Sequence, residues 1–160
     1  MRCHCDSQQP FEHCCQPYLS GITTPSSPLA LMRSRYSAFV LGLGDYLLHT
    51  WHPDTRGQLT ADELSTQGQN TEWLGLTIIF ATNEMTSTTS VVEFKVRYRE
   101  HGRVAYLHER SNFELLSGRW LYRDGLINPP KIKLNQACPC GAAHRATPKK
   151  YKHCCAKRSV

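Results

Sequence analysis

Eight cysteines divide this chain of 160 residues into two short ends and a long cysteine-free middle. The two sets are Cys3, Cys5, Cys14 and Cys15, and then Cys138, Cys140, Cys154 and Cys155. The chain starts without an apolar leader, so we expect a cytoplasmic protein whose reduced cysteines bind metal or act in catalysis. Four thiolates match a tetrahedral structural zinc site, and we predict two zinc ions per chain, one for each set. An iron–sulfur cluster or disulfides are the alternatives.

The two ends also repeat one pattern. Each has a C-x-C pair followed by an aromatic residue, one variable residue, a histidine and two adjacent cysteines, at 11–15 and again at 151–155. Segments this short cannot bury a core, so metal binding, worth about 10–16 kcal/mol in zinc-finger peptides, would supply their folding energy. Four histidines in these ends are alternative ligands, although four thiolates already complete each site. They are His4, His13, His144 and His153.

The middle of the chain begins with three predicted helices. Ser27 and Pro28 indicate a helix start. Apolar residues then recur at a spacing of three to four, at Leu29, Met32, Tyr36, Phe39, Leu43 and Leu47. Gly42 and Gly44 interrupt this pattern, so we expect the first helix to end there and a shorter one to follow over 45–51. A capping box at 60–63 predicts a third short helix that ends near Gly68.

Four antiparallel strands are predicted after the helices. An apolar run lies within 73–82, and apolar and charged residues then alternate over 92–99. His101-Gly102 and Ser117-Gly118 indicate two tight hairpins that lead to the third and fourth strands. Three helices followed by a meander of long strands predict an α+β domain with helices on one face of a curved sheet.

Positive charge is concentrated in residues 131–160. The whole chain has 19 basic and 13 acidic residues, a net charge of +6, but residues 131–160 contain eight of the basic residues and no acidic one. A basic end on a slightly acidic body predicts an anionic partner, such as RNA, the ribosome or an acidic protein surface, with solubility alone as the alternative. The hydrophobic content of 40% and the absence of a long apolar run exclude disordered and membrane-spanning classes.

The final cysteines resemble the SEC-C motif, C-P-C-G-S-G-x-x-[YF]-x-x-C-[CH], through residues 138–141 and 149–155. The last segment departs from it in spacing, because 13 residues separate Cys140 from Cys154, whereas the usual eight separate Cys5 from Cys14. In the first segment, His4 and Asp6 replace the motif's proline and glycine. The motif implies that the cysteines it matches bind zinc.

The middle of the chain is similar to the YchJ family of small bacterial proteins, for example in Met32-Arg33-Ser34-Arg35-Tyr36-Ser37-Ala38-Phe39 and in residues 107–113 and 118–125. This resemblance implies a nuclear-transport-factor-like (cystatin-like) roll of helices on a curved antiparallel sheet, flanked by two small zinc knuckles. We place the knuckles at 1–21 and 131–160 and the roll at 22–130. The family has no established activity, so the resemblance leaves the function open.

A roll of this kind usually has a pocket between its helices and its concave sheet, and seven polar or aromatic residues are candidates for it. They are Arg33, Arg35, Tyr36, His108, Glu109, Ser111 and Asp124. Glu109 and Ser111 share a predicted strand face with apolar residues, and a carboxylate there needs a partner, for which Arg33, Arg35 or Arg97 is available. Such a pair would be a pocket floor, a catalytic acid or a structural ion pair.

Three functions stay open at this point. No phosphate-binding or hydrolase motif is present, and zinc held by four thiolates has no open position for water, so we expect structural zinc and no catalysis by it. The favoured function is an adaptor that docks on the ribosome or on a protein-targeting or chaperone system through Lys149, Lys150, Tyr151 and Lys152. The alternatives are small-molecule binding or an unassigned enzymatic activity in the roll pocket, and single-stranded nucleic-acid binding with Tyr151 as the stacking ring.

Overall fold

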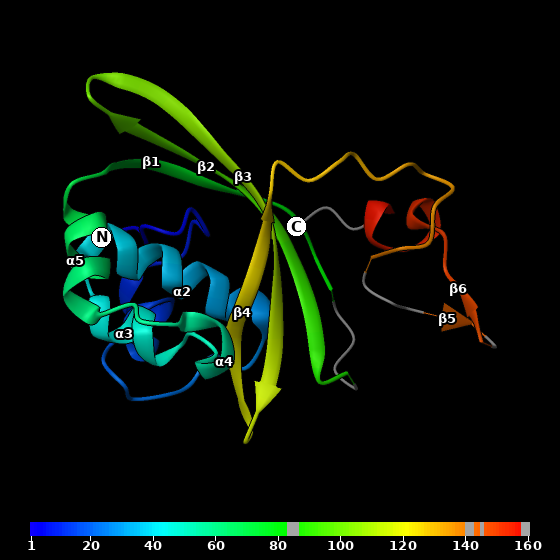
Figure 1. The fold of residues 1–160 in the computed structure, drawn as a ribbon, viewed down its shortest axis with the longest axis horizontal. Helices are drawn as coiled ribbons and strands as arrows, with labels where there is room; N and C mark the ends of the chain where they lie inside the picture. The colour runs from blue at the N-terminus through cyan, green and yellow to red at the C-terminus, as the bar shows by residue number, and fades with distance from the viewer. Residues whose placement is uncertain (83–86, 140–142, 145, 158–160) are drawn as a thin grey trace.

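Helices cover one face of a curved four-stranded antiparallel sheet (Figure 1). The computed structural model describes residues 1–82, 87–139, 143–144 and 146–157. The strands are β1 (Glu72–Ala81), β2 (Thr89–Glu100), β3 (Arg103–Leu116) and β4 (Arg119–Ile127), and they pair in chain order. The predicted meander is therefore confirmed, with a fourth strand that extends beyond 119–123, where the sequence pattern indicated it.

The helices are short apart from one. They are η1 (Phe11–His13), α1 (Gln16–Leu19), α2 (Pro28–Leu41), α3 (Gly44–His49), α4 (Pro53–Arg56) and α5 (Ala61–Gln69). After the sheet, the chain continues through β5 (Ala143–His144), β6 (Thr147–Pro148), η2 (Tyr151–His153) and η3 (Cys155–Lys157). None of the helices in the described residues is both long enough and apolar enough to cross a membrane.

Local capping marks both ends of α2 and the start of α5. The Ser27 side chain accepts a hydrogen bond from the backbone N–H of Ala30, and Gly42 ends α2 in the left-handed conformation at φ +67°. Thr60 and Glu63 form the predicted capping box of α5. The predicted apolar stripe is wrong at Leu43, which lies between α2 and α3 and is 38% exposed, because the chain changes direction at Gly42.

Both predicted hairpins are confirmed, and both have two consecutive residues in the left-handed region. His101 and Gly102 have φ of 49° and 76°, and Ser117 and Gly118 have φ of 50° and 77°. Two positive φ values are the mark of a type I′ turn, whose twist matches that of the strands it joins. The first turn fixes a regular register between β2 and β3, in which Phe94 of β2 lies opposite Glu109 of β3.

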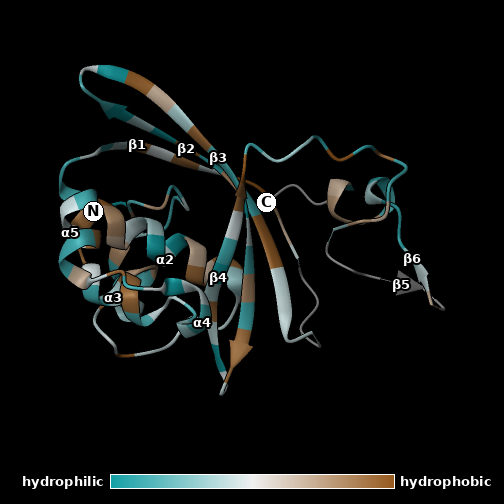
Figure 2. Ribbon diagram, viewed as in Figure 1, coloured by the Kyte–Doolittle hydropathy of each residue, from teal (hydrophilic) through white to brown (hydrophobic). Residues whose placement is uncertain are grey.

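The two ends of the chain lie on opposite sides of the sheet (Figure 1). Figure 2 shows hydrophobic and hydrophilic residues alternating along the strands, so the concave face packs on the helices while the other face is largely polar. A register shift between Ile78 and Phe80 places Phe80 opposite Glu93, on the face away from the helices. The C-terminal segment packs there, whereas the first 15 residues lie beside α2 and β1.

Candidate functional site

The N-terminal cysteine cluster, Cys3, Cys5, Cys14 and Cys15, has the geometry of a four-thiolate metal site. The four sulfur atoms all lie within 4.8 Å of one another. Cys5 Sγ is 3.6 Å from Cys14 Sγ, and Cys14 Sγ is 3.8 Å from Cys15 Sγ. Tetrahedral zinc with Zn–S bonds of about 2.3 Å requires sulfur–sulfur distances of about 3.8 Å. The cluster therefore fits one ion of this kind.

The protonation chemistry of this cluster also favours a bound cation. Hydrogen bonding to Cys15 lowers the pKa of the Cys5 thiol to about 4, and the same bond raises the pKa of Cys15. Burial raises the pKa of Cys14 to about 11. Without a bound cation, ionisation of Cys5 therefore makes ionisation of Cys14 and Cys15 less favourable. A divalent cation removes this conflict by stabilising all four thiolates together.

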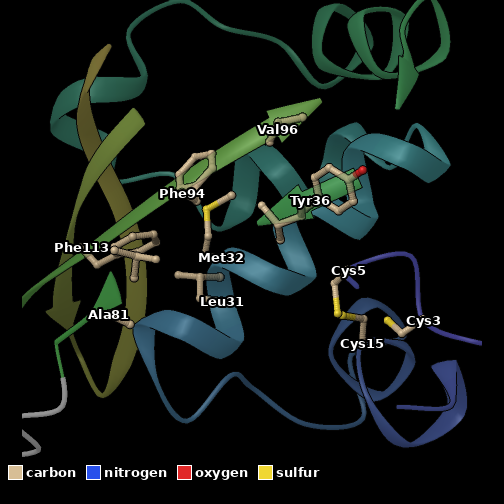
Figure 3. Close-up of a cluster of buried hydrophobic side chains, with 12 residues drawn as sticks. Cys3, Cys5, Cys15, Leu31, Met32, Tyr36, Ala81, Phe94, Val96 and Phe113 are labelled. Atoms are coloured by element: carbon tan, nitrogen blue, oxygen red, sulfur yellow. The ribbon is translucent and has the colours of Figure 1, made fainter. Parts of the chain in front are cut away.

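The N-terminal cluster is part of the main hydrophobic core. Cys5 is fully buried, and Cys3, Cys5 and Cys15 pack in one group with Tyr36 of α2 and Leu76 of β1. Figure 3 shows the three cysteine side chains gathered beside α2. Two polar contacts fasten the cluster to the roll. Arg33 Nη1 donates to the Cys5 carbonyl oxygen at 2.7 Å, and the backbone N–H of Leu76 donates to Asp6 Oδ2 at 3.1 Å.

The C-terminal cysteine cluster, Cys138, Cys154 and Cys155, is a second group whose sulfur atoms lie within 4.8 Å of one another. Cys140, the fourth predicted ligand, lies outside the described residues. All three described cysteines are buried, and they pack with Phe80 of β1. This cluster is therefore attached to the outer face of the sheet, away from the main core.

The candidate partner-binding residues lie beside the C-terminal cluster. The Tyr151 ring packs edge-on against Phe80, with ring centroids 5.9 Å apart. Lys150 is exposed, while Lys149 and Lys152 are partly exposed. Tyr151 therefore joins the cluster to the sheet, and the three lysines flank it in the sequence.

A cavity of about 190 Å³ lies between α2 and the concave face of the sheet. Three of the seven candidate pocket residues line it, namely Arg35, Tyr36 and Glu109. Most of the other lining residues are aromatic or aliphatic. They are Met32, Phe39, Trp51, Gln67, Trp73, Phe94, Val96, Leu107 and Tyr122. Gln67 is exposed and lies at the rim of the cavity.

Arg35 is a buried cation in the wall of this cavity. It is 3% exposed, and its Nη1 donates to the Leu47 carbonyl oxygen and to Thr50 Oγ1, both at 2.7 Å. Its guanidinium carbon lies 5.2 Å from the ring centroid of Trp51 and 4.7 Å from that of Tyr122. Burial lowers the pKa of Arg35 to about 10, so the side chain stays positively charged at neutral pH.

Glu109 is the buried anion of the same cavity, at 8% exposure. Its hydrogen-bond donors are hydroxyl groups rather than the predicted arginine, with Ser111 Oγ at 2.7 Å and Tyr122 OH at 3.0 Å from Oε1. Gly125 of β4 makes room for the carboxylate, because a Cβ there would lie 2.0 Å from Oε1. Tyr122 therefore links the two charges, with its ring against Arg35 and its hydroxyl on Glu109.

The remaining candidate pocket residues do not line the cavity. Arg33 contacts the N-terminal cluster, as described above, and Ser111 lies behind Glu109. His108 is on the opposite face of the sheet, where its Nε2 lies 2.8 Å from Glu93 Oε1. Asp124 is exposed and accepts a hydrogen bond from Asn112.

Trp51 and Tyr122 are two of the nine cavity-lining residues that the sequence analysis did not name as pocket candidates. Their rings meet edge-on with centroids 4.9 Å apart. The backbone N–H of Tyr122 donates to Thr50 and that of His52 donates to Tyr122, which joins the segment after α3 to β4. The alternation in β4 was the available signal for Tyr122, since it lies opposite Phe113, a residue of the apolar face.

The comparisons with known proteins identify the family. The model of the YchJ middle domain, an NTF2-like domain, matches residues 27–125. The chain belongs to the YchJ family. YchJ relatives of nearly the same length include a UPF0225 protein of Enterobacter sp. (strain 638), 41% identical, and one of Serratia proteamaculans (strain 568), 39% identical. The alignments cover 96% and 97% of both chains, respectively.

Two solved structures support the same assignment. The solution structure of a SEC-C motif containing protein from Rhodopseudomonas palustris, 33% identical, has a TM-score of 0.72 and covers 79% of this chain and 98% of that chain. The crystal structure of a SEC-C motif containing protein from Psychrobacter arcticus, 26% identical, has a TM-score of 0.69 and covers 98% of this chain and 96% of that chain. The predicted NTF2-like roll between two cysteine clusters is therefore confirmed.

Proposed function

We propose that this YchJ-family protein is a zinc-binding adaptor that docks on an anionic macromolecular partner through its basic C-terminal segment. The observation that carries the proposal is the distribution of charge. Residues 131–157 contain seven basic residues and no acidic one, and Lys131, Lys133, Lys150 and Lys157 are exposed. A concentrated positive surface attracts RNA, ribosomes or acidic protein surfaces of targeting or chaperone systems.

The architecture of the C-terminal segment suits a docking arm. It lies across the sheet from the helices (Figure 1). Its buried contacts with the sheet are centred on Phe80. Zinc with four thiolates has a formal charge of −2, so the eight basic residues of 131–160 would leave about +6 after metal binding. The segment would therefore still attract anions after metal binding. The metal would also order the segment by holding its cysteines together.

Metal analysis tests the zinc part of this proposal. Protein kept reduced throughout purification is expected to contain two zinc ions per chain, because both clusters gather buried cysteine sulfurs within reach of one ion. Elemental analysis by mass spectrometry together with a protein assay gives the ratio. A Cys15→Ser variant and a Cys154→Ser variant should each lose about one ion. Less than one zinc per wild-type chain would contradict the proposal.

Charge removal tests the docking part. Changing Lys149, Lys150 and Lys152 to glutamine is expected to weaken capture of ribosomes or of other anionic partners from extract by about tenfold or more. Each lysine that contacts a phosphate contributes about 0.7–0.9 to the slope of log affinity against log salt, so the slope should fall by about two. Sedimentation or pull-down at several salt concentrations gives both quantities.

The matched control removes the same charge from the roll. Lys95, Arg103 and Arg119 are exposed basic residues outside the C-terminal segment, and their change to glutamine also lowers the net charge by three. This control should retain capture. If the two triple variants behave alike, or if the C-terminal variant binds like the wild type, the adaptor function is wrong.

Ribonuclease treatment and a Tyr151 variant distinguish between the possible partners. Capture that survives ribonuclease points to an acidic protein, whereas capture that is lost points to RNA or the ribosome. Tyr151 packs against Phe80, which favours docking by charge over stacking of the ring on bases. Tyr151→Ala should therefore loosen zinc in the C-terminal cluster, and loss of RNA binding at unchanged zinc content would instead support stacking.

A further inference from the structure

The cavity under α2 has the size and walls of a site for one small ring. Its volume is about 190 Å³, and an apolar protein cavity of about 150 Å³ is large enough to take up benzene. Phe39, Trp51, Trp73 and Phe94 supply aromatic surfaces from α2, from the segment after α3 and from two strands. Such walls favour a flat guest that packs by stacking and edge contacts.

The two buried charges differ in what they offer to a guest. Arg35 Nη1 already donates hydrogen bonds to the Leu47 carbonyl oxygen and to Thr50 Oγ1, and the Trp51 and Tyr122 rings contact its guanidinium. Glu109 lines the cavity, and both hydrogen bonds to its carboxylate in the described structure end on Oε1. An ionised carboxylate has about four acceptor positions on its two oxygens. Oε2 is therefore the acceptor that a guest can use.

Charge balance restricts the guest further. Arg35 and Glu109 already offset one another within the wall of the cavity, so a charged guest would bring an uncompensated charge into a site lined mostly by apolar surface. A carboxylate guest would in addition face Glu109. A neutral guest that donates a hydrogen bond has neither cost.

We propose that this cavity binds a neutral aromatic or heteroaromatic molecule of one ring, which donates a hydrogen bond to Oε2 of Glu109. The site is separate from the basic C-terminal segment, which lies on the other side of the sheet. Ligand binding in the cavity can therefore be tested independently of the adaptor function.

Three probes of similar shape test the proposal on the zinc-loaded full chain. Phenol donates a hydrogen bond, toluene does not, and benzoate is an anion. Phenol is expected to bind about tenfold more tightly than toluene, since a hydrogen bond to a charged group is worth about that much. Benzoate should not bind measurably. Nuclear magnetic resonance of the indole N–H groups reports binding, because Trp51 and Trp73 line the cavity and Trp120 does not.

A matched pair of variants tests the role of the carboxylate. Glu109→Gln keeps the shape, and its amide oxygen can accept from Ser111 and Tyr122, which turns the amide NH₂ toward the guest. Phenol should then bind no better than toluene, and benzaldehyde, which only accepts, should gain affinity. Glu93→Gln is the control, because Glu93 is equally buried, at 6% exposure, but contacts His108 and Arg110 on the opposite face of the sheet. It should bind all the probes as the wild type does.

A third variant keeps the test decisive if Glu109→Gln does not fold. Val96→Ile adds one methylene group to the wall of the cavity and should weaken phenol and toluene alike, by about threefold or more. Equal affinity of wild-type protein for phenol and toluene would overturn the assignment to Glu109. Preferential binding of benzoate, or shifts at Trp120 instead of Trp51 and Trp73, would overturn the proposed ligand class and site.

Discussion

Replacing Cys15 with serine is expected to lower the free energy of unfolding of the roll by about 3 kcal/mol or more. Cys15 is 1% exposed and packs in the main core with Tyr36 and Leu76. Loss of one ligand weakens the binding of the proposed zinc ion. The remaining buried thiolates then carry negative charges that the metal no longer offsets. Urea unfolding followed by near-ultraviolet circular dichroism of Trp51, Trp73 and Trp120 measures the effect.

The same change in the other cluster is the control. Cys154→Ser should lower the stability of the roll by less than about 1 kcal/mol, because the described cysteines of the C-terminal cluster pack on the outer face of the sheet and not in the main core. Its effect should instead appear as protease sensitivity of residues 131–160. Similar loss of roll stability in both variants would contradict this asymmetry, and so would an unchanged transition in Cys15→Ser.

Replacing Arg35 with methionine is expected to destabilise the roll by about 3–4 kcal/mol. Breaking a buried charged network commonly costs this much, because partners are left without compensation. Here the Leu47 carbonyl and the Thr50 hydroxyl lose a donor, two aromatic rings lose a cation, and the charge of Glu109 is no longer offset. Equilibrium unfolding in urea provides the measurement.

Two further variants show whether charge or shape accounts for this loss. Arg35→Lys keeps the charge but loses the planar group that contacts both rings, so about half of the stability should return. Combining Arg35→Met with Glu109→Gln should cost less than the two single changes added together, since it removes both buried charges. Additive effects would show that Arg35 and Glu109 are not coupled.

Local chemistry in the sequence was sufficient for the starts of α2 and α5, for the two hairpins and for the cysteine clusters. The cap at Ser27, the capping box at Thr60 and the left-handed pairs at the two hairpins each depend on residues within about four positions of one another. The cysteine repeats likewise specify their own clusters, seven of whose eight members lie among the described residues. Interactions between residues so close in the sequence form largely independently of how the rest of the chain packs.

The hydrogen-bond partners of the candidate pocket residues could not be predicted from the sequence. Arg33 and Arg35 lie two positions apart on α2, and both were plausible partners for Glu109. The helix directs Arg33 to the Cys5 carbonyl and Arg35 into the cavity wall, and the carboxylate takes its hydrogen bonds from Ser111 and Tyr122. No local pattern distinguishes these outcomes, because they depend on which elements α2 packs against.

The sequence by itself determined the α+β class, the meander, the starts of α2 and α5 and the cysteine sets of this YchJ-family chain. Only the tertiary structure decided that the N-terminal cluster joins the main core while the C-terminal cluster lies across the sheet. The register shift between Ile78 and Phe80 is the physical reason for the second placement, because it turns Phe80 away from the helices. Strict alternation would have kept Phe80 on the same face as Ile78, and the C-terminal cluster would have lost the buried ring on which it packs.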